Sequence, residues 1–208
     1  MNKIQAKQIN SFGKNVLSIF IDDTPLSEII GTKSNDTRYK DLWCAWLLKK
    51  NNEPWEQHGN YVWTLLETKQ NCNLPILLCP DDMDFWCSVV VAQASYYNDI
   101  VVWGKIGIVT GQINKDQWNA SGIKDLKKWS EQDWELYGSS LATLKEDNED
   151  WERWCSEHWL DEENRRLWNY FHPYLNDDKN IEWLDGNSLS FYANDYDDCV
   201  AAFKGFVY

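Results

Sequence analysis

The stretch that decides the fold runs from Leu74 to Val109 and reads LPILLCPDDMDFWCSVVVAQASYYNDIVVWGKIGIV. Leu74–Cys79 is an apolar run of strand length, and its proline lies near the start, where a missing N–H is tolerated. Trp86–Ala94 and Ile100–Val109 are rich in β-branched residues and are separated by the polar segment SYYND. This pattern predicts a buried strand followed by a long antiparallel hairpin.

Further elements are expected towards the N-terminus. Val16–Ile21 predicts another buried strand, preceded by a polar arm and ended by the DDTP segment. The apolar residues between Tyr39 and Leu47 recur at helical spacing and predict an amphipathic helix. A shorter helix is expected over roughly residues 60–69.

The pattern after residue 110 is mainly helical. Helical spacing recurs over 134–144 and 151–159, and Asp161 is a candidate N-cap for a helix that ends before Pro173. Ile181–Leu184 and Leu189–Tyr192 flank the turn segment DGNS and predict a hairpin. A last helix is expected from about Asn194.

These elements predict a single α+β domain over residues 1–208. Its sheet is mostly antiparallel, comes from the N-terminal half and the C-terminal hairpin, and is packed by several amphipathic helices. The strand-rich half is 1–110 and the acidic, helix-rich half is 111–208. Most of the 14 tryptophans fall on faces expected to be buried, so their number alone does not indicate a binding site.

Charge is divided unevenly along the chain. Residues 1–130 contain 14 acidic and 14 basic residues, whereas residues 131–208 contain 19 and 6, so the whole formal charge of −13 lies in the last 78 residues. A field of one sign attracts partners of the opposite sign, although acidic surfaces also serve solubility. Nucleic acid is not expected as a partner, because phosphate contacts need a basic surface.

The apolar stretches are too short for a secretory leader or a membrane span, so a cytoplasmic protein without membrane contact is expected. In a reducing compartment the six cysteines are interpreted as buried thiols, since no CxxC motif suggests a redox or zinc site. No cofactor is expected.

Two clusters offer chemistry, and for both a structural role is favoured. Asp81, Asp82 and Asp84 follow a predicted strand and are the candidate ligands for a hard cation, but such residues also suit a turn, so no metal site is expected. Cys155 and His158 lie one helical turn apart and suit half a zinc site or a nucleophile pair, but they fall on an apolar face. We therefore expect that the protein is not an enzyme and has no catalytic residues.

Residues 146–163 contain nine acids, one base and three tryptophans. Interfaces use tryptophan as an anchor and rim charges to speed association, although a solvated helix face would look the same. The predicted partner-binding residues are Glu146, Asp147, Glu149, Asp150, Trp151, Glu152, Glu157, Trp159, Asp161, Glu162 and Glu163.

The segment from Leu74 to Cys87, with the valine-rich strand and VVWGKIG at 101–107, resembles a group of uncharacterised bacterial proteins. The whole chain, small, acidic and rich in tryptophan, is similar to immunity proteins of bacterial polymorphic-toxin and contact-dependent inhibition systems. The resemblance implies a cytosolic protein that binds and blocks one cognate toxin domain. Such toxins are often basic nucleases.

The leading hypothesis is therefore a stoichiometric inhibitor that neutralises a basic toxin, possibly a nuclease, through its acidic half. Two alternatives stay open. One is an enzyme that depends on a metal or on the Cys155/His158 pair. The other is an acidic DNA mimic that sequesters a nucleic-acid-binding protein.

Overall fold

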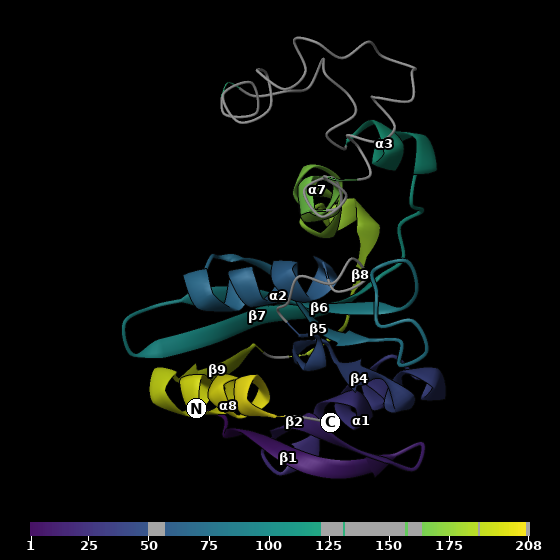
Figure 1. Ribbon diagram of the computed structural model, residues 1–208. Coiled ribbons are helices and arrows are strands. Elements are labelled where there is room, and N and C mark those ends of the chain that lie inside the picture. Colours follow the sequence, from purple (N-terminus) through teal and green to yellow (C-terminus); the bar gives the residue numbers. More distant parts are fainter. Residues whose placement is uncertain (50–56, 122–130, 132–156, 158–163, 187, 207–208) are drawn as a thin grey trace.

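An antiparallel sheet of six strands organises the protein, and a smaller antiparallel sheet of three strands lies apart from it (Figure 1). The computed structural model describes residues 1–49, 57–121, 131, 157, 164–186 and 188–206. Its strands are β1 (Ile4–Ser11), β2 (Lys14–Ile21), β3 (Thr24–Pro25), β4 (Trp43–Cys44), β5 (Cys72–Leu78), β6 (Val89–Tyr96), β7 (Ile100–Val109), β8 (Ile181–Trp183) and β9 (Leu189–Tyr192). The protein is therefore an α+β domain, as the sequence predicts.

Helices cover both faces of the large sheet. In Figure 1 α2 lies on one face, and α8 and α1 lie between the large sheet and the small one. The helices are α1 (Leu26–Lys33), α2 (Gln57–Thr68), α3 (Lys115–Ala120), α7 (His172–Leu175) and α8 (Ala193–Gly205). The predicted helices near 60–69 and from Asn194 are thus confirmed as α2 and α8, whereas α1 was not predicted.

The long hairpin predicted from Leu74–Val109 is confirmed. β5 pairs with β6 and β6 pairs with β7, all antiparallel. β6 therefore has a partner strand on each side, and its valines are buried. β6 begins at Val89 and not at Trp86. The register shifts between Pro75 and Leu77, where the proline cannot donate to the ladder.

β7 is the longest strand and carries two partners along its outer edge. β8 pairs with Gly107–Val109, and β9 pairs with Ile100–Trp103. The two C-terminal strands are therefore present as predicted, but each pairs with β7 and not with the other. Gly107 permits this approach, since a Cβ at that position would lie 2.7 Å from the Trp183 ring and 3.0 Å from the Glu182 carbonyl oxygen.

The N-terminal arm is a strand. β1 pairs along its whole length with β2, from Ile4 opposite Ile21 to Ser11 opposite Lys14. The strand predicted at Val16–Ile21 is confirmed as part of β2. The partner strand was missed because β1 carries few apolar residues and most of it is only half-buried.

The predicted helix between Tyr39 and Leu47 is wrong. This segment forms the short 3-10 helix η1 (Thr37–Asp41), then β4, then the 3-10 helix η2 (Ala45–Leu47). Every residue from Leu42 to Leu48 is buried, so the stretch has no polar face, and helical spacing cannot distinguish a helix from a buried crossing segment there.

The helix expected to stop before Pro173 continues past it. A π-helical turn, η5 (Leu167–Phe171), leads into α7, and the His172 N–H donates to the Leu167 carbonyl. Pro173 lies in the first turn of α7, where its missing N–H costs nothing. The helices predicted over 134–144 and 151–159 lie outside the described residues, except for Glu157.

Aromatic rings fill the space between the large sheet and α8. Trp46 of η2 meets Trp103 of β7 at 6.3 Å between ring centroids, and it meets Tyr196 and Phe203 of α8 at 5.6 Å each, all edge to face. Edge-to-face pairs add stability beyond the burial of area. Trp46 is fully buried, so it joins three distant parts of the chain.

Trp46→Ala is expected to lower the free energy of unfolding by about 3–5 kcal/mol, because it removes three ring contacts and leaves a cavity. Trp46→Phe should cost clearly less, since it keeps a ring and removes an indole N–H that has no hydrogen-bond partner among the described residues. Urea unfolding followed by circular dichroism measures both. Equal losses would contradict this account of the core.

Candidate functional site

Most of the predicted partner-binding segment lies outside the described residues. This holds for Glu146, Asp147, Glu149, Asp150, Trp151, Glu152, Trp159, Asp161, Glu162 and Glu163, and also for Cys155 and His158. Glu157 is described, and it is exposed and helical. One member of the predicted set is thus placed on the surface, and the rest of that prediction is untested.

Acidic residues farther along the chain also face solvent. Asp178, Glu182, Asp185, Asp195 and Asp198 are exposed, and none of them forms an ion pair with a described residue. By contrast, Asp197 pairs with Lys69 at 2.8 Å, and Asp177 pairs with Lys179 at 2.6 Å. The described C-terminal surface therefore carries several acids that are not engaged in an ion pair with a described residue.

An exposed aromatic row lies at one end of the large sheet, at the tip of the β6–β7 hairpin. Ile100 lies opposite Tyr192 across β7 and β9, and it also accepts a hydrogen bond from the Tyr97 N–H at 2.9 Å. Residues directly opposite in antiparallel strands share a face. Tyr97, Ile100 and Tyr192 form this row and are 65%, 36% and 58% exposed.

The aromatic row is bordered by acids. Asp99 is exposed in the hairpin turn, and its carbonyl accepts a hydrogen bond from the first N–H of α8, that of Ala193. Asp195 lies in the first turn of the same helix. Sequence reasoning missed the row, although the segment YYND and a tyrosine just before a run of aspartates were its available signals.

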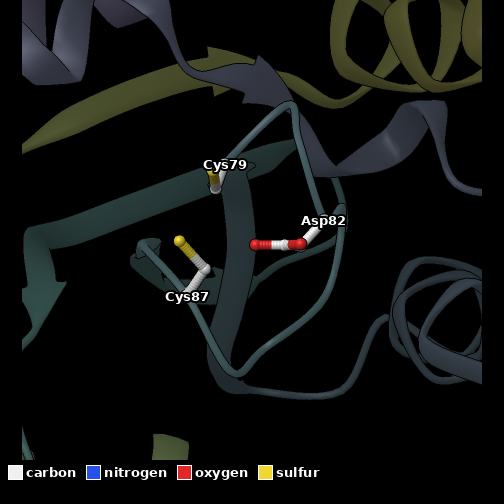
Figure 2. Close-up of side chains that lie close together, drawn as sticks. All are labelled: Cys79, Asp82 and Cys87. Atoms are coloured by element: carbon white, nitrogen blue, oxygen red, sulfur yellow. The ribbon is translucent and has the colours of Figure 1, made fainter.

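The three aspartates of the loop between β5 and β6 do not converge on one site. Asp84 caps the Trp86 N–H at 2.9 Å, and Asp81 is exposed. Asp82 instead lies beside Cys79 and Cys87, and one ligand atom from each of these three residues falls within 4.8 Å of the others (Figure 2). The groups at this loop that could hold a metal are therefore two thiols and the Asp82 carboxylate, and not the three candidate aspartates together.

The interpretation of all cysteines as buried thiols is wrong for Cys79 and Cys87. Cys44, Cys72 and Cys199 are buried, but Cys79 is half-buried and Cys87 is exposed. Partial desolvation raises the pKa of Cys87, and so does the hydrogen bond that its thiol donates to Cys79. Seven residues separate the two cysteines, so they do not form the short CxxC spacing by which paired cysteine ligands are recognised in a sequence.

Two histidines meet the aromatic core on the α2 side of the large sheet. His58 packs edge to face against Phe85 at 4.6 Å between centroids, and burial lowers its pKa to about 4. The Tyr61 hydroxyl bonds the Nδ1 atom of His172 at 2.9 Å, and burial raises the pKa of Tyr61 and lowers that of His172. Both histidines are therefore held neutral near pH 7.

No family model, curated protein or solved structure matches the chain. Among the residues that the structure describes, no helix has the length and apolar character needed to cross a membrane.

Because His58 is buried and neutral, the free energy of unfolding should fall as the pH is lowered. Its folded pKa of about 4 lies below the ordinary histidine value of 6.5, so the unfolded state binds the proton first as the pH falls. Stability should be lost progressively between pH 6.5 and pH 4, by about 3 kcal/mol in total. His58→Leu should remove most of this loss, whereas His172→Asn should retain it. Urea unfolding across this pH range tests the idea, and an unchanged pH slope in His58→Leu would refute it.

Proposed function

We propose that this protein is an immunity-type inhibitor that acts in the cytoplasm, where it binds and neutralises a basic toxin domain such as a nuclease. Its acidic C-terminal residues attract the partner, and the complex contains one copy of each protein. The observation that carries the proposal is the partition of charge, which leaves residues 1–130 neutral and places −13 on residues 131–208.

Acidic residues without an ion-pair partner among the described residues lie on the C-terminal surface. The exposed acids of the described C-terminal surface, among them Asp195 and Asp198, form no ion pair with a described base, although Lys3 lies near these two. Fields of one sign raise association rates with oppositely charged partners and penalise acidic competitors. A protein that must find one basic toxin quickly would benefit from both effects.

The aromatic row supplies candidate anchors. Tyrosine is enriched among the residues that dominate binding energy, and rim charges control how fast partners meet. Tyr97 and Tyr192 are exposed in the free protein and have acids next to them. This combination suits a basic protein surface, with the segment from Glu146 to Glu163 as the second acidic contact.

The proposal is tested by rescue. The protein is co-expressed with the product of the adjacent upstream gene, and growth and co-purification are measured. Restored growth together with a stable complex of equal stoichiometry is expected. Growth inhibition that persists, or the absence of a complex, would refute the proposal.

Reversing Asp147, Glu149 and Asp150 to lysine should slow association with the basic partner and flatten its dependence on salt, because the steering field weakens. The matched control reverses Glu28, Asp41 and Asp116, which gives the same change in net charge within the neutral part of the chain. Stopped-flow or surface-plasmon kinetics measure the two sets. Equal effects of the two triple variants would mean that only total charge matters, and not its position.

Tyr97→Ala combined with Tyr192→Ala should weaken the complex by at least about 30-fold, mainly through faster dissociation. Both side chains are exposed, so the free energy of unfolding should change by less than about 0.5 kcal/mol. Phe12→Ala, which removes an exposed ring from the turn between β1 and β2, is the control. Unchanged dissociation in the double variant would remove the row from the interface.

A further inference from the structure

We propose that Cys79, Asp82 and Cys87 form a zinc site at the base of the loop between β5 and β6. The observation is the convergence of two sulfur atoms and one carboxylate oxygen within 4.8 Å of one another. Figure 2 shows the Asp82 carboxylate extending towards the two cysteines, of which Cys79 directly follows β5 and Cys87 lies shortly before β6.

The loop is held in this shape by its own hydrogen bonds. The Cys79 N–H donates to the Ser88 carbonyl at 3.1 Å, which closes the base of the loop beside both cysteines. The Cys79 carbonyl accepts from the Met83 N–H at 3.0 Å, and Met83 takes a left-handed backbone with φ of 50°. This tight turn directs Asp82 back over the thiols.

The far side of the loop is anchored in the core. Phe85 is 1% exposed and packs edge to face against His58, Tyr61 and Phe171. The Asp84 carboxylate fixes the following turn by accepting the Trp86 N–H at 2.9 Å. Because these contacts do not depend on a ligand, the three donor groups are close together before a metal binds. Binding a metal ion therefore costs little conformational entropy of the loop.

The donor set selects zinc over hard cations. Magnesium and calcium take oxygen ligands, whereas thiolates with a carboxylate suit zinc. Tetrahedral zinc with Zn–S bonds of about 2.3 Å holds its ligand atoms about 3.8 Å apart, so the present cluster needs to contract by only about 1 Å. Three protein ligands leave one position for water or for a donor from another molecule.

Binding is a simple exchange of protons for metal. Each thiol releases a proton as its sulfur bonds to Zn²⁺, and the Asp82 carboxylate supplies the third bond. The same two sulfurs joined as a disulfide would no longer be ligands, so the site requires the reduced protein. This inference concerns a loop of the strand-rich half and does not depend on the proposed inhibitor function.

The test uses the full chain, reduced and stripped of metal, titrated with Zn²⁺ against a chromophoric chelator. One zinc ion per chain is expected, and Co²⁺ in its place should give a thiolate-to-metal charge-transfer band. Cys79→Ser and Cys87→Ser should each remove the band and weaken zinc binding by more than about 100-fold, and Asp82→Asn should weaken it by about 10-fold or more.

Two controls separate this site from others. Asp81→Asn removes a neighbouring carboxylate outside the cluster, and Cys155→Ser removes a thiol elsewhere in the chain, so both should bind zinc like the unchanged protein. In the unchanged protein, zinc should also protect Cys79 and Cys87 from alkylation by iodoacetamide, as read by peptide mass spectrometry. This second readout does not rely on any variant folding.

Three results would overturn the proposal. They are the absence of zinc binding by the reduced protein, binding that survives both Cys79→Ser and Cys87→Ser, and a charge-transfer band that disappears only with Cys155→Ser. Alkylation of Cys79 and Cys87 at the same rate with and without Zn²⁺ would also overturn it.

Discussion

The burial of Trp46 among Trp103, Tyr196 and Phe203 is the contact on which the arrangement of the chain depends. It brings η2, the long strand β7 and the last helix α8 to one point. These segments come from early, middle and late parts of the sequence, so none can bury its aromatic face without the others. The cost of ordering the long intervening chain is offset by burying several large rings together.

This core determines what the surface can do. Because α8 is fixed against Trp46 by Tyr196 and Phe203, Asp195 and Asp198 lie on the side of the helix next to β1, where both remain exposed. The same helix begins directly after Tyr192, so the exposed tyrosines and the acids are held in a constant relation by a rigid scaffold. Preorganisation of this kind reduces the entropy lost on binding.

Sequence patterns predicted elements well where local preference and burial agree. The hairpin of β6 and β7 follows from two β-branched runs around a polar turn, and α8 from Tyr196, Cys199 and Phe203 at helical spacing. They failed where pairing is between distant segments. Nothing local in Ile181–Trp183 or Leu189–Tyr192 indicates that both strands add to β7, and the apolar run of η2 fits more than one backbone.

Some features of the candidate sites can be predicted from the sequence, and others depend on contacts between distant segments. The acidity of residues 131–208 is a property of composition and can be read directly, whereas the aromatic row exists only because β9 pairs with β7. The cluster of Cys79, Asp82 and Cys87 depends on the turn at Met83, which folds the carboxylate back. Motif searches with fixed short spacings do not detect ligands brought together by the closure of a loop.

The division of the outer edge of β7 between β8 and β9 has a consequence for behaviour in concentrated solution. An unbroken exposed strand would offer a continuous ladder of free N–H and C=O groups to another chain, which is how edge-to-edge aggregation begins. Here that edge is only three and four residues long on either side of the Asp185–Gly186 turn. At the opposite edge of the sheet, β4 is only two residues long, and farther along β5 the Asn176 side chain accepts the Asn73 N–H. Neither edge therefore presents a full strand on which a second molecule could extend the sheet.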